Sequence, residues 1–248
     1  MRLVLLGAPG SGKGTQGKRL ASRFRIPQIS TGDLLRAAVE GRTPEGLKAR
    51  ESMDAGRLVD DAVVLAIIRR RLAEDDARRG FILDGFPRNL AQAQALDTLL
   101  SDIGAPLDAA LYIRVDHDAL VERIAGRLSC PRCGTIYNRF TQPPKIDELC
   151  DVCGTPLRHR SDDNSETVTN RLRVYAQQTE PLIAYYAERG LLRTVDGDGE
   201  VPAVARAILA EIRALQAKES QTRSSPRRPG SRGGRSTGSR GSGHGRRR

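Results

Sequence analysis

The sequence predicts an α/β fold of three layers, in which a parallel central sheet lies between two layers of helices. Short apolar runs with strand character alternate along the chain with longer amphipathic runs of helical period. A glycine-rich loop joins the first apolar run to the first helical pattern. The length of 248 residues suffices for one substantial core with small inserts.

Each element follows from its residue pattern. Residues 60–73, for example, form a helical pattern with Val64, Ile67 and Leu72 on one apolar face. Alternation of strands and helices is typical of a parallel sheet, whose ligands bind at the carboxyl ends of the strands. The expected strands are residues 3–6, 27–29, 80–83, 109–115 and 191–195. The expected helices are residues 13–24, 31–40, 44–55, 60–73, 89–100, 116–128, 166–188 and 201–217.

The loop after the first strand has the spacing of a phosphate-binding loop. Residues 7–16 are Gly-Ala-Pro-Gly-Ser-Gly-Lys-Gly-Thr-Gln, so backbone N–H groups can converge on one point. The helix N-terminus adds its positive end, and Lys13 adds a mobile cation. We therefore expect a nucleoside triphosphate here. Because Gly14 follows Lys13 and the hydroxyl comes later, at Thr15, we expect Mg²⁺ to be held through water and phosphate oxygens.

The net charge of +11 is concentrated at the C-terminal end of the sequence. Residues 218–248 hold ten Lys or Arg and one acid, Glu219, and therefore carry +9 of that charge. From residue 220 on there is no apolar side chain to bury, so we expect a disordered tail rich in Arg, Gly and Ser. This tail either keeps the protein in solution or binds RNA or other polyanions weakly.

The rest of the composition is that of an ordinary soluble protein. No apolar stretch approaches the length of a membrane span. The apolar run before Gly7 is too short for the core of a signal peptide. We therefore expect a cytoplasmic protein without a membrane segment.

The four cysteines of the sequence form two Cys-x-x-Cys pairs, Cys130 with Cys133 and Cys150 with Cys153. Two such pairs separated by 16 residues are typical of a tetrahedral zinc site. Disulfides are the alternative, which a cytosolic location disfavours. Four thiolates leave the metal no open position, so the expected zinc is structural and stabilises an insert too small for its own core.

Arginines stand at the junctions between elements, where a ligand would lie. Arginine offers a permanent charge and a planar fork that matches phosphate oxygens. Phosphoryl transfer to a monophosphate needs charge cancellation and alignment rather than a general base, because the acceptor is already anionic. The three histidines, His117, His159 and His244, are accordingly expected to be structural or on the surface. The arginines are Arg36, Arg88, Arg123, Arg127, Arg160 and Arg171.

Several separated motifs together resemble those of one known family. The phosphate loop resembles that of nucleoside monophosphate kinases, adenylate kinases above all, and Ser30-Thr-Gly-Asp-Leu-Leu-Arg36 resembles the start of their monophosphate-binding domain. Leu83-Asp-Gly-Phe-Pro-Arg88, followed by Gln92, resembles their second acceptor motif. Arg160-Ser-Asp-Asp163 and Arg171 resemble their lid hinge and the helix after it. The cysteine insert is similar to the zinc-bearing lid of the long-form bacterial enzymes, and the match covers residues 1 to about 217.

The resemblance implies a P-loop fold with a parallel central sheet, a helical monophosphate-binding insert and a zinc-bearing lid. It implies reversible phosphoryl transfer from ATP to AMP, giving two ADP, with Mg²⁺ and structural Zn²⁺ as cofactors and lid closure excluding water. A monomer with ATP and AMP as its partners is expected. The implied division is a core of residues 1–29, 60–126 and 164–217, a monophosphate-binding domain of 30–59, a lid of 127–163 and a tail of 218–248.

The resemblance also implies roles for single residues. The catalytic groups would be Lys13, Asp84, Arg88, Arg123, Arg160 and Arg171. The ATP site would be formed by Gly10, Ser11, Gly12, Lys13, Gly14, Thr15, Arg127, Ile136, Tyr137 and Gly199. The AMP site would be formed by Thr31, Arg36, Arg57, Leu58, Val59, Gly85, Phe86, Pro87, Arg88, Gln92, Arg160 and Arg171. Asp84 and Asp33 would orient Mg²⁺ through water, and the four cysteines would hold zinc.

Two alternatives stay open. A UMP/CMP kinase, or an AMP kinase that uses GTP as donor, would share the loop and the arginines, although the long lid and Thr31 favour AMP as the acceptor. A nucleic-acid-binding factor regulated by a nucleotide would account for the basic tail and the zinc site, but the cysteines lie between two helices of the P-loop domain rather than at a terminus.

Overall fold

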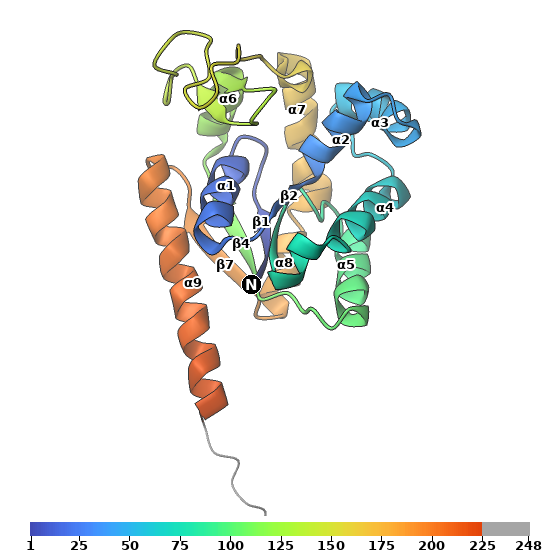
Figure 1. Ribbon diagram of the computed structural model, residues 1–248, viewed down its shortest axis with the longest axis vertical. Coiled ribbons are helices and arrows are strands. Elements are labelled where there is room, and N and C mark those ends of the chain that lie inside the picture. The colour runs from blue at the N-terminus through green and yellow to red at the C-terminus, as the bar shows by residue number, and fades with distance from the viewer. Residues whose placement is uncertain (225–248) are drawn as a thin grey trace, which may run out of the picture. The chain divides into compact units, whose positions relative to one another are not determined.

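The computed structural model describes residues 1–224, apart from the side chains of residues 117 and 218–224. The chain divides into two compact units, Met1–Glu211 and Ile212–Arg248. The first unit contains the sheet, the helices around it and the cysteine insert (Figure 1). The second unit is described only as the end of one helix.

A five-stranded parallel sheet lies at the centre of the first unit, which confirms the predicted α/β class. Its spatial order is β2-β3-β1-β4-β7, so the phosphate-loop strand is in the middle. In β3 every residue is buried, as continuous apolar runs in parallel strands require. The strands are β1 (Arg2–Leu6), β2 (Gln28–Ser30), β3 (Phe81–Asp84), β4 (Ala109–Arg114) and β7 (Leu192–Asp196).

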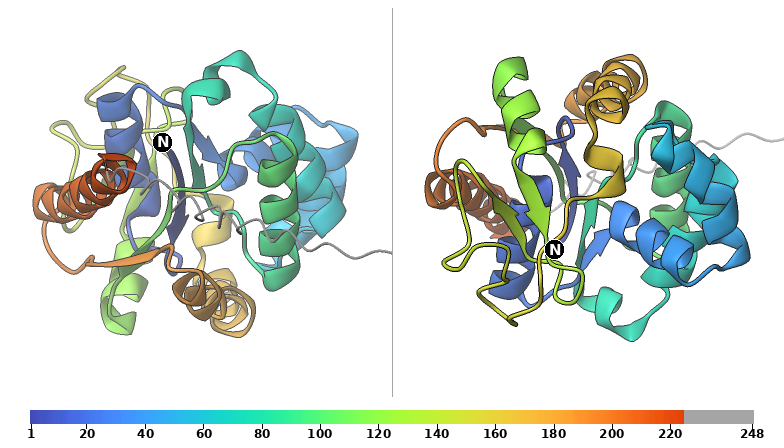
Figure 2. Two further views of the ribbon diagram at one scale, coloured as in Figure 1. Left: turned by 90° about the horizontal axis from the view of Figure 1, so that it is seen from below. Right: turned by 90° about the horizontal axis from the view of Figure 1, so that it is seen from above.

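Helices cover both faces of the sheet, as the views from below and from above make clear (Figure 2). On one face Val4 packs in a core with Ile68, Leu96 and Tyr186, which come from α4, α5 and α8. On the other face α1 approaches so closely that a Cβ at Gly17 would be 3.1 Å from Leu5 Cδ1. The helices are α1 (Lys13–Phe24), α2 (Thr31–Glu40), α3 (Pro44–Asp54), α4 (Asp61–Leu72), α5 (Leu90–Asp102), α6 (His117–Ala125), α7 (Ser165–Val174), α8 (Leu182–Glu188) and α9 (Val201–Ser224).

Short polar side chains cap the N-termini of the helices that surround the site. Ser30 accepts a hydrogen bond from the Asp33 backbone N–H at the start of α2, at 3.3 Å. Asn89 caps α5 at 2.8 Å, and Asn164 caps α7 at 2.9 Å. Each cap occupies one otherwise unpaired N–H and fixes where the helix begins. The loops before these helices therefore enter the site with defined geometry.

The sequence prediction was wrong in part at the two ends of the cysteine insert. The helix expected to reach residue 128 ends at Ala125, with Gly126 as its C-cap, because the residues that follow pair with another strand. Residues 127–129 form β5 (Arg127–Ser129), antiparallel to β6 (Ile136–Asn138). The helix expected over 166–188 is interrupted by a π-helical turn, Tyr175–Thr179, and restarts after Pro181.

The last helix is longer than its sequence prediction, since α9 runs to Ser224 rather than to residue 217. Residues 218–224 contain neither Gly nor Pro, so nothing in their sequence stops the helix. The disorder expected from residue 218 on is therefore wrong for this short segment. The remaining tail, residues 225–248, and His244 within it lie outside the described residues. Among the helices described, none combines the length and the apolar character needed to span a bilayer.

Two adjacent tyrosines of α8 should respond in opposite ways to loss of the hydroxyl. The Tyr186 hydroxyl is buried without a hydrogen-bond partner in the described structure, whereas the Tyr185 hydroxyl donates to Asp97 at 2.6 Å. An unpaired buried hydroxyl costs about 1–3 kcal/mol, and an average hydrogen bond contributes about 1 kcal/mol. Tyr186→Phe should raise the melting temperature by a few degrees and Tyr185→Phe should lower it. Calorimetry of both variants checks this, and a decrease for Tyr186→Phe would contradict the assignment.

Candidate active site

A cavity of about 760 Å³ opens at the carboxyl ends of the central strands. This is where ligands bind in a parallel sheet with helices on both faces. With two exceptions, every residue that the sequence analysis assigned to a site lines this cavity. The first exception is Phe86, whose side chain is fully buried in the core. The second is the group of four cysteines, which lies in the insert.

The phosphate loop forms one wall of the cavity. Gly10 and Gly12 have φ of 86° and 88°, a region that favours glycine. A Cβ at Gly10 would also lie 2.8 Å from Ile124 Cγ1, so α6 packs directly on the loop. Lys13 Nζ donates to the carbonyl oxygens of Gly7 at 2.7 Å and Ala8 at 2.8 Å. The loop thus presents a fixed ammonium beside the N-terminus of α1.

The electrostatic environment of Lys13 disfavours its charge in the absence of an anion. The pKa of Lys13 is lowered to about 8, chiefly by burial and in addition by the charges of Arg88, Arg171 and Arg127, against the opposing effect of Asp84. Desolvated cations of this kind gain most when an anion enters the site. The loop is therefore suited to hold phosphate.

Five arginines gather across the cavity from this loop: Arg36, Arg88, Arg127, Arg160 and Arg171. Burial lowers the pKa of Arg88 to about 10, with Arg171 adding to the effect. Burial also lowers the pKa of Arg160 to about 10, with Arg36 and Arg127 contributing. These guanidiniums repel one another in a partly desolvated space. Such an arrangement matches a ligand with several phosphate groups.

Arg123 differs from the other arginines assigned to the site. It lines the cavity from α6, yet the largest electrostatic effects on the pKa of Lys13, Arg88 and Arg160 come from other residues. Arg127, on β5, does perturb the pKa of both Lys13 and Arg160. The structure therefore brings Arg127 into the central cluster and leaves Arg123 at its edge.

Aspartates on neighbouring turns hold the arginines in place. Asp163, whose side chain is 1% exposed, accepts from Arg127 Nε at 2.7 Å and from Arg171 Nη1 at 3.0 Å. Asp162 lies 3.1 Å from Arg171 Nη1 and 3.8 Å from Arg36 Nη1. Both aspartates belong to the motif Arg160-Ser-Asp-Asp163, from which no role for the carboxylates was predicted. The sequence feature that could have indicated this role is the pair of acidic residues next to Arg160, at the end of the insert.

A second set of polar contacts orders the far side of the cavity. Gln92 donates from Nε2 to Asp61 Oδ1 at 2.6 Å and accepts from the Arg88 backbone N–H at 2.8 Å. Thr31 Oγ1 donates to the Gly85 carbonyl at 2.7 Å. Asp61, at the start of α4, was not identified from the sequence. Asp61 fixes the orientation of the Gln92 amide. This contact joins two helices that are far apart in sequence, so no short motif indicates it.

Asp84, at the end of β3, and Asp33, in the first turn of α2, both line the cavity. Burial raises the pKa of Asp84, although the nearby Lys13 opposes this, and Gln28 donates to Asp84 Oδ2 at 2.9 Å. For Asp33, burial tends to raise the pKa, but Arg36 and Arg160 outweigh it and the net direction is downward. Carboxylate oxygens are ligands that suit a hydrated divalent cation such as Mg²⁺.

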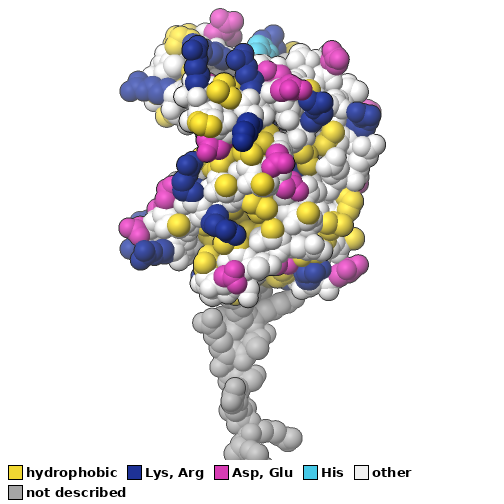
Figure 3. All heavy atoms as spheres, turned by 90° about the vertical axis from the view of Figure 1, so that its right-hand side faces the viewer, with side chains coloured by type: hydrophobic (Ala, Val, Ile, Leu, Met, Phe, Trp, Pro, Cys, Tyr) yellow, Lys and Arg dark blue, Asp and Glu magenta, His cyan; other side chains and the backbone are white. Residues whose placement is uncertain are grey.

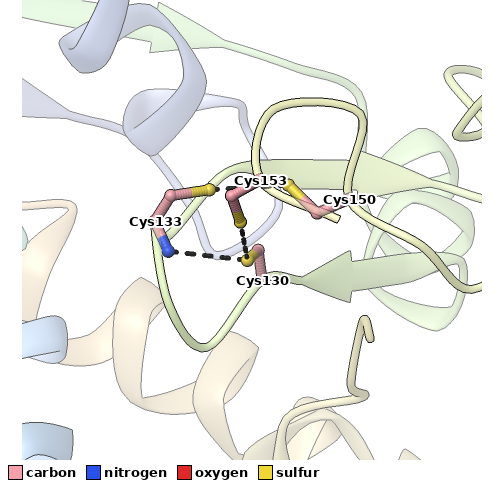
Figure 4. A group of neighbouring side chains, drawn as sticks. All are labelled: Cys130, Cys133, Cys150 and Cys153. Atoms are coloured by element: carbon pink, nitrogen blue, oxygen red, sulfur yellow. Dashed lines mark hydrogen bonds between the residues drawn. The ribbon is translucent and has the colours of Figure 1, made fainter. Parts of the chain in front are cut away.

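The four cysteines converge in the insert, as the sequence predicted (Figure 4). Their Sγ atoms all lie within 4.8 Å of one another, and Cys130 and Cys150 are buried. The separations of 3.4 Å between Cys130 and Cys153 and 3.5 Å between Cys133 and Cys150 are too long for disulfides. Thiolates around a tetrahedral zinc stand about 3.8 Å apart, so this arrangement is compatible with zinc.

Two matching turns carry these cysteines. The Gly134 N–H donates to the Cys130 carbonyl at 2.9 Å, and the Gly154 N–H donates to the Cys150 carbonyl at 2.8 Å. Both glycines are left-handed, with φ of 65° and 67°. The side chains packed around them are few, chiefly Leu128, Tyr137 and Leu157. So small a core gives the insert little stability of its own.

Comparison with known proteins identifies relatives over most of the chain. A family model described as adenylate kinase matches residues 5–191. A protein of Thermodesulfovibrio yellowstonii is 53% identical over 85% of this chain and 98% of its own length. A protein of Syntrophotalea carbinolica is 54% identical over 86% and 98%, and one of Methanosarcina mazei is 49% identical over 88% and 99%. All three carry the name adenylate kinase.

The pKa of Lys13 predicts how phosphate binding depends on pH. An anion in the loop raises this pKa above its unliganded value of about 8, so binding takes up a proton at higher pH. The dissociation constant of a non-hydrolysable nucleoside triphosphate should rise no more than about twofold from pH 7 to 8 and then by up to about tenfold per pH unit. Titration calorimetry checks this. Lys13→Arg should flatten the pH profile, and the same slope in both proteins would contradict the role of Lys13.

Proposed function

The chain belongs to the adenylate kinase family, and on that premise we propose that it transfers the γ-phosphoryl group of ATP to AMP, yielding two ADP. The observation that carries the proposal is the single cavity in which the phosphate loop faces a cluster of five partly buried arginines. Two nucleotides meeting there would bring several phosphate groups into one space. The cations supply the charge that such a meeting requires.

The donor half is formed by the loop and the insert. Gly10 to Thr15 would bind the ATP phosphates through backbone N–H groups, with Lys13 on the outer phosphates. Ile136 and Tyr137 of the insert would close over the donor, and the backbone at Gly199 would contact its base. We assign Arg127 to the donor phosphates, which is supported by its effect on the pKa of Lys13.

The acceptor half is formed by the α2–α3 segment and the turn after β3. Arg36 and Arg88 would bind the AMP phosphate, and Gln92, fixed by Asp61, would read the adenine ring. Thr31, Gly85 and Pro87 would complete the pocket, together with Arg57, Leu58 and Val59 on the opposite wall. Phe86 supports this site from the core rather than lining it.

The transfer itself needs alignment and charge cancellation. With Arg160, Arg171 and Arg123 added, the cations would surround the phosphoryl group as it moves between the two nucleotides. AMP already carries the attacking oxygen as an anion, so no general base is assigned. Adenylate kinases use Mg²⁺ with ATP, and when bound this ion neutralises phosphate charge. Asp84 and Asp33 would hold its water ligands, which fits their place in the cavity lining.

The moving parts are proposed to be two inserts on a rigid core. The core would consist of residues 1–29, 60–126 and 164–217, the monophosphate-binding domain of 30–59, and the lid of 127–163. Closure of the lid would exclude water, which otherwise competes with AMP for the phosphoryl group. Cys130, Cys133, Cys150 and Cys153 are proposed to bind a structural zinc that makes the lid a rigid body.

The comparisons favour this reading over a UMP/CMP kinase, a GTP-dependent AMP kinase or a nucleic-acid-binding factor. On the face drawn in Figure 3, acidic and basic side chains are interspersed, unlike the basic patch of a nucleic-acid-binding surface. Polyanion binding by the basic tail stays a prediction. So do the monomeric state and the cytoplasmic location.

An assay of nucleoside diphosphate formation tests the function directly. With Mg·ATP, the purified protein should form ADP rapidly with AMP and at least 100-fold more slowly with UMP, CMP or GMP. Lys13→Ala should lose this activity, because the loop loses the cation on the outer phosphates. Preference for UMP or CMP would contradict the assignment of Gln92 and Thr31. No turnover with any acceptor would contradict the proposed function.

Removal of zinc tests the role of the lid metal. Treatment with a chelator should lower the melting temperature by about 5 °C or more, because the lid has little core of its own. At saturating ATP and 25 °C, the rate should fall by less than about threefold. Cys150→Ser should melt at the lower temperature and be insensitive to the chelator. Loss of turnover with an unchanged melting temperature would contradict a purely structural metal.

A further inference from the structure

Lys18 connects the helix of the phosphate loop to the insert. It lies on α1, one and a half turns after Lys13, and its side chain points away from the loop to the first cysteine turn. Lys18 Nζ donates to the Cys133 carbonyl at 3.3 Å and to the Gly134 carbonyl. These partners are more than 110 residues away in sequence. The contact therefore exists only while the insert lies against α1.

The insert and α1 approach each other closely at this contact. Gly134 is left-handed, and a Cβ there would lie 2.9 Å from Lys18 Nζ. Nearby, a Cβ at Gly14 would lie 3.1 Å from Ile136 Cδ1 of the insert. Two glycines, one on each side, thus allow the insert and α1 to approach closely. This close approach is independent of the hydrogen bonds and points to the same closed arrangement.

The acceptors of Lys18 have fixed positions. Both carbonyls belong to the turn in which the Gly134 N–H donates to the Cys130 carbonyl. A zinc ion with four thiolates would carry a net charge of −2, which also attracts an ammonium group. Lys18 therefore meets a rigid and electronegative surface of the insert.

We propose that Lys18 is a positioning residue that holds the lid closed over the donor nucleotide. The inference rests on the proposed function, because closing the insert serves a purpose only if a triphosphate lies beneath it. A group that contacts only the closed state shifts the open–closed equilibrium toward closure. It thereby raises the affinity for the ligand that binds under the lid. The acceptor site, formed by α2, α3 and the turn after β3, does not depend on this contact.

The test compares Lys18→Met with Lys18→Arg, which keeps a cationic donor. Arg23→Met is the matched control, since Arg23 is an exposed cation on the same helix. In Lys18→Met, the dissociation constant of a non-hydrolysable ATP analogue and the KM for ATP should both rise three- to tenfold. The KM for AMP should change less than twofold, and kcat should not fall, because opening the lid releases product. Lys18→Arg and Arg23→Met should stay within twofold of the parent protein.

The outcomes separate this proposal from the proposed function. Each variant is first shown to keep the zinc content and melting temperature of the parent, so that an unfolded insert does not imitate the effect. If the parent forms no ADP, the proposed function fails, while binding of the ATP analogue still tests Lys18. If the parent is active but Lys18→Met binds the analogue within twofold of it, the role of Lys18 is overturned. An equal loss of affinity in Arg23→Met, or no rescue in Lys18→Arg, overturns it as well.

Discussion

The structure depends on confining mutually repelling cations around one cavity. Lys13 and five arginines point into a space of about 760 Å³, and burial lowers the pKa of Lys13, Arg88 and Arg160. Placing such charges close together without counterions costs free energy. The fold offsets part of this cost with Asp33, Asp162 and Asp163, which contact the arginines. Phosphate groups would offset the remainder, so the free energy of the site favours polyanionic ligands.

The arrangement of the chain explains how so many cations reach one place. In a parallel sheet all strands end at the same edge, so the loop after β1 and the turns after β2 and β3 meet there. Arg36 comes from α2 and Arg88 from the turn after β3, while Arg127, Arg160 and Arg171 come from the two ends of the insert and from α7. Capped helix starts fix the entry of α2, α5 and α7. The arginines therefore come together because of the topology of the sheet, although they are far apart in the sequence.

The sequence predicted those features that depend on local spacing. The phosphate loop, the alternation of strands and helices and the convergence of the four cysteines each follow from residues within one motif or one period. The features it missed depend on contacts between distant segments. Residues 127–129 leave α6 to pair with residues 136–138, and Asp61 orients Gln92 from another helix. Phe86 belongs to the acceptor motif, yet the core formed by other helices takes up its side chain. The hydrophobic periodicity of the sequence does not indicate which distant segments these residues contact.

The guanidinium of Arg127 belongs both to the connection between the insert and the core and to the phosphate site. Arg127 begins the insert and Asp163 ends it, and their ion pair joins the two connecting segments. Beyond this pair, Ser129 and Arg158 exchange two backbone hydrogen bonds of 2.9 Å, which continue the connection into the insert. In the proposed function the insert would rotate as one body while this connection keeps its two ends together. Arg127 also contributes to the lowered pKa of Lys13, so the ion pair and the phosphate loop share one guanidinium. Binding of phosphate and orientation of the proposed lid would therefore be linked through this side chain.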